Sequence, residues 1–76
     1  MHLSEEMERW EQYEIWALPA SGSRWEFVAA FHDFDVASAV ATRRGRNVRL
    51  IHAVYVDGQL KEQQVLVELG RPRQTA

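Results

Sequence analysis

Four arginines stand between positions 43 and 49 of a chain whose formal net charge is -2. The cluster consists of Arg43, Arg44, Arg46 and Arg49, with no acidic residue among them. Guanidinium groups at this density can bind the phosphates of a nucleic acid, and they can equally bind the glutamates of another protein chain. The cluster therefore raises two hypotheses, and the elements that carry the arginines help to choose between them.

The residues before the cluster predict a helix that ends within it. In "DFDVASAVATRRG", Asp33 or Asp35 can cap the helix, and Gly45 can take the left-handed conformation that terminates one. Arg43 and Arg44 then occupy the last helical turn, where the helix dipole favours cations by about 0.3–1 kcal/mol. A stripe of small apolar side chains would let this helix lie close against a sheet: Val36, Ala37, Val40 and Ala41.

The other two arginines follow the predicted helix. Arg49 projects from a predicted strand and is expected to pair with Glu68 diagonally across a hairpin. Arg46 lies in the intervening loop and has no structural role. We therefore expect Arg46, with help from its neighbours, to meet the glutamates of another chain.

Nucleic-acid binding is the alternative that the cluster supports. Arginines beside the aromatic residues Trp16 and Tyr55 are typical of single-strand binding, which combines phosphate contacts with base stacking. The sequence pI of about 5.9 and the acidic N-terminal residues disfavour it, because they repel the same polymer. The chain also has no RNP-type string, helix-turn-helix pattern or zinc-ligand spacing. Nucleic acid therefore ranks second to a protein partner.

The histidines offer a weaker hypothesis, a ligand pocket. His32 ends one predicted strand and His52 lies within another, so the two would approach each other if those strands were neighbours. The spacing in "HDFD" matches no metal-ligand pattern, and Asp33 and Asp35 are better explained as helix caps. We predict no metal site and no cofactor.

The chain lacks the usual machinery of an enzyme. It has no cysteine, no glycine-rich phosphate loop and no serine beside a histidine-bearing motif. We therefore predict no catalytic residues, and any catalysis would need a pocket between subunits.

The length of 76 residues predicts one domain with a thin core, since a chain this short buries only about 60% of its unfolded surface. Without cysteine no disulfide can reinforce that core, which leaves oligomerisation as the remedy. No apolar run approaches the roughly 18 residues of a membrane span, and the N-terminal residues lack the apolar stretch of a signal peptide. We expect a soluble cytoplasmic protein with no membrane association.

The N-terminal residues are acidic and predict a short helix. Ser4 can cap a helix over 4–11, with Glu5 and Glu6 in the first turn, where the dipole favours acids. These glutamates complement the arginine cluster, so two copies can dock in a two-fold dimer. We expect an acidic segment, a single α+β domain and a disordered basic tail, at residues 1–12, 13–70 and 71–76.

Alternating apolar residues predict two β-hairpins. Strands over 13–18 and 24–32 flank the turn "PASGS", and in the second strand Phe27 is expected to share a face with Ala29 and Phe31. Asp57-Gly58 is the preferred pair for a two-residue type I′ turn in the second hairpin. The register set by that turn pairs Val56 with Gln59, Tyr55 with Leu60, His52 with Gln63, Ile51 with Gln64, Leu50 with Val65, Arg49 with Leu66 and Val48 with Val67.

These elements predict an α+β fold, a small two-layer sandwich in which one main helix covers one face of an antiparallel four-stranded ββαββ sheet. Both faces of the sheet carry apolar residues, because Trp16, Leu18 and Val28 oppose the set that packs on the helix. One short helix cannot cover two faces, so the second face is covered either by the N-terminal segment or by another subunit, and we expect another subunit. The function expected is a small protein-interaction module, a homodimer or an adaptor subunit.

Overall fold

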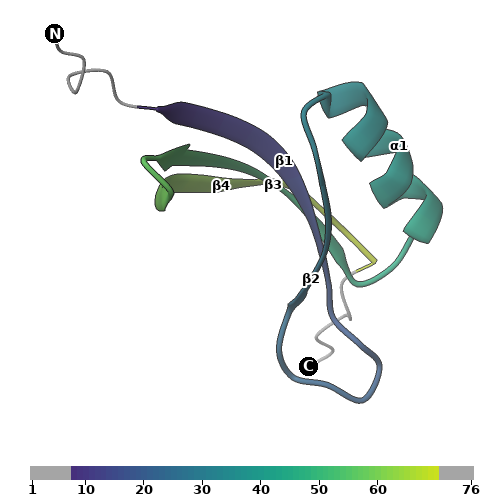
Figure 1. Cartoon of the computed structure of the whole chain (residues 1–76). Coiled ribbons are helices and arrows are strands. Elements are labelled where there is room, and N and C mark those ends of the chain that lie inside the picture. The colour runs from purple at the N-terminus through teal and green to yellow at the C-terminus, as the bar shows by residue number, and fades with distance from the viewer. Residues whose placement is uncertain (1–7, 71–76) are drawn as a thin grey trace, which may run out of the picture.

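A computed structural model describes residues 8–70, which form two β-hairpins joined by one helix (Figure 1). The elements are β1 (Arg9–Ala17), β2 (Glu26–Phe31), α1 (Phe34–Arg44), β3 (Val48–Val56) and β4 (Gln59–Leu69). The strands form one antiparallel sheet in the order β2-β1-β3-β4, and α1 packs against β1, β2 and β3 on one face. The predicted ββαββ fold, an α+β arrangement of one sheet and one main helix, is confirmed.

Local capping explains why α1 begins and ends where it does. The Asp33 side chain accepts a hydrogen bond from the Asp35 backbone N–H at 2.8 Å, so Asp33 is the N-cap. Gly45 has a φ of 74°, and its N–H donates to the carbonyl of Ala41. Both predicted boundaries are confirmed, and Asp35 lies inside the first turn.

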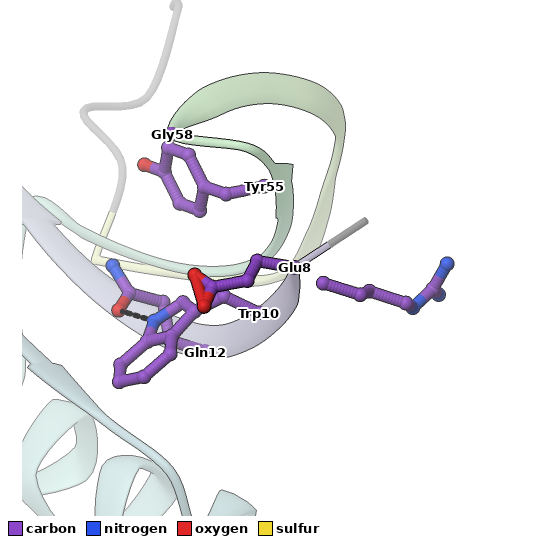
Figure 2. Close-up of a pocket in the computed structure, with 6 residues that line it drawn as sticks. Glu8, Trp10, Gln12, Tyr55 and Gly58 are labelled. Atoms are coloured by element: carbon purple, nitrogen blue, oxygen red, sulfur yellow. Dashed lines mark hydrogen bonds between the residues drawn. The ribbon is translucent and has the colours of Figure 1, made fainter. Parts of the chain in front are cut away.

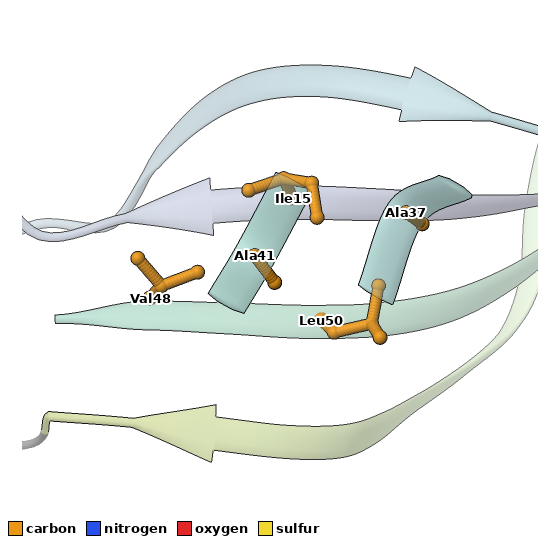
Figure 3. Packing of buried hydrophobic residues seen from close by; sticks show 5 residues of the cluster. All are labelled: Ile15, Ala37, Ala41, Val48 and Leu50. Carbon is orange, nitrogen blue, oxygen red and sulfur yellow. The ribbon is translucent and has the colours of Figure 1, made fainter. Parts of the chain in front are cut away.

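The core lies between α1 and the two central strands (Figure 3). Ile15 on β1 is paired with Leu50 on β3, and both are buried against Ala37 and Ala41 of the helix. The two alanines let the helix approach the sheet closely, as the stripe of small residues predicts. Val48 completes the buried cluster.

The predicted N-terminal helix is wrong where the structure describes it. Residues 9–11 belong to β1, which pairs with β3 without interruption from Arg9 opposite Val56 to Ala17 opposite Val48. A short isolated helix is marginal in water, and this strand pairing supplies a long-range partner instead. The domain therefore extends to Arg9 rather than beginning at residue 13. The remaining acidic residues of that prediction, Glu5 and Glu6, and the tail at 71–76 lie outside the described residues.

Two β-bulges in β4 change the predicted register of the second hairpin. Asp57 and Gly58 have φ values of 51° and 83°, as a type I′ turn requires, and the first two pairs beyond the turn are as predicted. Lys61 and then Leu66 are extra residues in the ladder, and each moves the later pairs by one position. The observed pairs are His52 with Gln64, Ile51 with Val65, Leu50 with Val67, Arg49 with Glu68 and Val48 with Leu69.

A third irregularity changes the face on which Phe27 lies. The second strand begins at Glu26, so Arg24 and Trp25 belong to the preceding loop. The register shift between Ile15 and Trp16 pairs Phe27 with Trp16, whereas Ala29 and Phe31 pair with residues of the opposite face. Phe27 therefore lies on the face of the sheet away from the helix.

Candidate functional site

The helix-free face of the sheet is the surface opposite α1. Because side chains alternate along a strand, the neighbours of the buried Ile15 and Leu50 point to this face. Its residues come from all four strands: Trp10, Gln12, Glu14 and Trp16 on β1, Phe27 on β2, Arg49, Ile51 and Tyr55 on β3, and Leu60, Gln63 and Val65 on β4.

A buried carboxylate lies at the centre of this face. Glu14 is only 4% exposed, and its side chain accepts three hydrogen bonds. The donors are the Tyr55 hydroxyl at 2.7 Å, Gln12 Nε2 at 2.8 Å and Trp16 Nε1 at 2.9 Å. The Gln12 side chain in turn accepts a hydrogen bond from Trp10 Nε1 at 2.6 Å (Figure 2). Two strands and four side chains thus hold one carboxylate in place.

The hydrogen bonds decide the ionisation of this group. Burial raises the pKa of Glu14, but the hydrogen bonds from Tyr55, Gln12 and Trp16 together outweigh burial and hold the pKa below its ordinary value. The pKa of Tyr55 is raised, mainly because its hydroxyl donates to Glu14, with burial and the charge of Glu14 adding to the effect. Near neutral pH the pair is therefore a carboxylate and a neutral phenol that donates to it.

A cavity of about 370 Å³ opens beside Glu14. Aromatic side chains from two strands and one loop line it, namely Trp16, Tyr55 and Trp25, together with the apolar Ile51 and Leu60. Pockets that are mostly apolar with a few placed polar groups are the usual form of a ligand site. The cavity thus combines aromatic walls with a buried, ionised carboxylate.

Arg49 forms one edge of this cavity. Its Nε donates to the Glu68 carboxylate, and its guanidinium lies 4.1 Å from the centre of the Trp25 ring. The predicted pairing with Glu68 is confirmed, although the two bulges, at Lys61 and Leu66, together place the two residues directly opposite rather than diagonally. Arg49 therefore has a structural role in holding Trp25 over the sheet.

A second, more open cavity of about 540 Å³ lies toward the turn of the second hairpin. Glu8, Trp10 and Gln12 line one side, and Tyr55 and Gly58 line the other (Figure 2). Tyr55 lines both cavities, so the two hollows adjoin along the helix-free face.

The structure separates the arginine cluster into three environments. Arg43 and Arg44 occupy the last turn of α1, on the other side of the sheet from the aromatic residues. Arg46 is exposed in the loop after Gly45. Of the four arginines, only Arg49 shares a face with the predicted interaction residues Trp16 and Tyr55. Both of these side chains are half-buried and donate hydrogen bonds to Glu14.

The structure does not bring the two predicted pocket histidines together, because β1 separates β2 from β3. His32 makes an edge contact with the Trp10 ring at 4.8 Å. His52 lies on the helix side, where its Nε2 is 3.1 Å from a Glu11 oxygen and its ring lies near Tyr13. Within residues 8–70, no group of three or more His, Asp or Glu side chains is placed to hold a metal ion.

Sequence reasoning missed Glu14 and Trp25 as site residues. Glu14 counts in the sequence only as one of several N-terminal acids. The available signal was the alternation of Trp10, Gln12, Glu14 and Trp16, which places an acid among aromatic and amide side chains on one strand face. Trp25 had no such signal, because it acts from a loop.

Over residues 8–70 the structure contains no helix with the length and apolarity needed to cross a membrane. Comparison of the chain with protein-family models, with curated proteins and with solved structures finds no match.

Proposed function

We propose that this chain is a protein-interaction module that forms a homodimer through the helix-free face of its sheet. The observation that carries the proposal is the exposure of large apolar side chains on that face: Trp10 at 51%, Phe27 at 53%, Leu60 at 47% and Val65 at 46%. They surround the half-buried Trp16 and Tyr55. Contiguous exposed apolar surface is typical of an interface, and aromatic residues are enriched at interface centres.

A second copy of the chain suits this face because the two charged groups near its centre, Glu14 and Arg49, already have hydrogen-bond or ion-pair partners within the chain. Glu14 is buried and accepts three hydrogen bonds. The guanidinium of Arg49 is bound to Glu68. Two copies related by a two-fold axis therefore bring their exposed apolar side chains together, and no exposed charges of the same sign face each other at the centre. Burying this surface also supplies the core area that so short a chain lacks.

The mass of the protein in solution tests the proposal. Two substitutions on β4, one on each face of the sheet, provide a variant and its control. Val65 pairs with Ile51 on the helix-free face, whereas Val67 pairs with Leu50 on the helix side, and both are partly exposed. Sedimentation equilibrium is expected to give twice the chain mass of 8.8 kDa for the wild type and for Val67→Lys. Val65→Lys is expected to give a folded monomer. A wild-type monomer at high micromolar concentration would refute the homodimer.

Nucleic-acid binding remains the alternative, and it rests on the charge of Arg43, Arg44, Arg46 and Arg49. The separation of the helical arginines from the aromatic face gives it less support than the dimer. It predicts that labelled single-stranded DNA or RNA binds at low salt and that Arg43→Ala with Arg46→Ala weakens binding. Absence of a mobility shift at low salt would exclude it.

A further inference from the structure

The Glu14 carboxylate is a buried negative charge that forms no ion pair within the described residues. Among residues 8–70, no Lys, Arg or His nitrogen forms an ion pair with its oxygens. Its three partners are an amide, an indole and a phenol. A carboxylate offers about four lone-pair positions, so one acceptor position is left. Oε1 accepts from Trp16 alone, whereas Oε2 accepts from both Gln12 and Tyr55.

The walls of the cavity beside this carboxylate are suited to a positive charge. The faces of Trp and Tyr rings attract cations, and they attract them more strongly where water is excluded. The cavity already contains one example, because the Arg49 guanidinium stacks on Trp25. Arg49 is engaged by Glu68 rather than by Glu14, so the rings of Trp16 and Tyr55 and the carboxylate are left for another cation.

The size and lining of the cavity limit what that cation can be. A volume of about 370 Å³ is within the range of small-ligand pockets and exceeds the needs of a bare metal ion. Ile51 and Leu60 add apolar wall that a short alkyl stem can cover. An anion would be repelled by Glu14, and a neutral group would leave its charge uncompensated.

We propose that the cavity beside Glu14 binds an organic monocation, an alkylguanidinium or alkylammonium group, with the charge near the Glu14 carboxylate and over the rings of Trp16 and Tyr55. This site goes beyond dimer formation, but it lies on the same helix-free face, so its occupant competes with a second copy for the surface around Trp16 and Tyr55. The group can belong to a free small molecule or to an arginine or lysine side chain of a protein, and the test separates these sources.

Indole N–H signals in ¹⁵N-resolved NMR spectra provide the readout. The chain has three tryptophans, of which Trp16 and Trp25 line the cavity. Trp10 reaches Glu14 only through Gln12, so its signal is expected to shift less than the other two. Butylguanidinium is expected to shift the Trp16 and Trp25 signals with a Kd of about 1 mM, the affinity typical of so small a ligand. Butylurea has nearly the same shape but no charge, and it is expected to bind about tenfold more weakly.

A capped Gly-Arg-Gly peptide distinguishes the sources of the cation. Tighter binding of the peptide than of butylguanidinium would support a protein side chain as the ligand, whereas equal or weaker binding would support a free small molecule. The proposal is overturned if butylurea binds as well as butylguanidinium, or if neither changes the Trp16 and Trp25 signals. The same titration with Val65→Lys, the expected monomer, measures ligand binding without competition from a second copy, because Val65 does not line the cavity. Failure of the dimer and failure of the cation site are therefore distinguishable.

Two substitutions on β1 form a matched pair for this test. Glu14→Gln removes the buried charge, and Glu11→Gln makes the same change on the opposite face of the same strand. Glu14→Gln is expected to weaken butylguanidinium binding about tenfold, and Glu11→Gln is expected to leave it unchanged. Trp16→Phe serves if Glu14→Gln does not fold, and it is expected to weaken binding several-fold. Undiminished binding by a folded Glu14→Gln or Trp16→Phe protein would contradict the proposal.

Discussion

The hydroxyl of Tyr55 donates a 2.7 Å hydrogen bond to the carboxylate of Glu14, although the two residues are 41 positions apart in the chain. This contact joins β1 to β3 on the helix-free face, directly behind the core that α1 covers. It places a polar network among the exposed apolar side chains Trp10, Phe27, Leu60 and Val65. The stability of the sheet and the chemistry of the candidate site therefore depend on the same pair of residues.

Tyr55→Phe is expected to lower the free energy of unfolding by about 1–2 kcal/mol, because it removes one of three donors from a buried charge. Urea denaturation measures the change. Tyr13→Phe is the control, since Tyr13 lies on the helix side and its hydroxyl makes no hydrogen bond to another residue of the described part. Equal losses for the two variants would show that the Glu14 contact contributes nothing measurable.

The pKa shifts of Glu14 and Tyr55 predict how the free energy of unfolding depends on pH. The pKa of Glu14 is lowered in the folded protein, so its contribution is present above the ordinary value of 4.5 and is lost as pH falls through the folded pKa. The pKa of Tyr55 is raised, so its contribution is present below the ordinary value of 10.0 and is lost as pH rises through the folded pKa. Urea denaturation from acid to alkaline pH is therefore expected to show a plateau between these values.

Substitutions assign the two limbs of that pH profile. Tyr55→Phe is expected to flatten the alkaline limb, and Glu14→Gln is expected to reduce both limbs, because it removes the acceptor that shifts Tyr55. Glu11 also has a lowered pKa, mainly through its hydrogen bond with Arg9 and then that with His52, so part of the acid limb remains in Glu14→Gln. An alkaline limb that survives in Tyr55→Phe would contradict the assignment.

Two glycines are expected to differ sharply in their tolerance of alanine. Gly58 and Gly70 both have positive φ, but nothing lies within 4 Å of a Cβ built on Gly58, whereas a Cβ on Gly70 would lie 2.4 Å from the Cα of Arg46. Gly58→Ala is expected to cost about 1–2 kcal/mol through backbone strain alone. Gly70→Ala adds a collision with the backbone and is expected to cost clearly more. Thermal or urea unfolding of both variants measures the difference, and equal costs would contradict the close approach.

Arg49→Lys is expected to lower the free energy of unfolding by about 0.5–1 kcal/mol, because lysine keeps the charge but loses the guanidinium over the Trp25 ring and the Nε contact to Glu68. The Trp25 indole signal is expected to move toward its position in an unfolded peptide. Arg44→Lys, in the last turn of the helix, keeps the favourable charge and is expected to change neither quantity. An unmoved Trp25 signal in Arg49→Lys would contradict the stacking role.

Features formed by residues close together in the sequence were predictable. Asp33 as N-cap, Gly45 as the helix end and Asp57-Gly58 as the hairpin turn each depend on hydrogen bonds or φ values within one turn of chain. The order of the four strands and the main helix followed from these signals and from apolar alternation. The Arg49–Glu68 pair was also predicted, although the bulges that align it were not.

What the sequence determined by itself was therefore the main helix with its two ends, the turn of the second hairpin and the presence of four strands, because capping and turn preferences act over a few residues. Tertiary structure decided that residues 9–11 join β1, since only pairing with β3 stabilises them as a strand. It also decided the bulges, which arise where two strands adjust to each other. Tertiary structure likewise decided the network at Glu14. Its donors come from β1 and β3, and only the assembled sheet brings Tyr55 to the carboxylate that it stabilises.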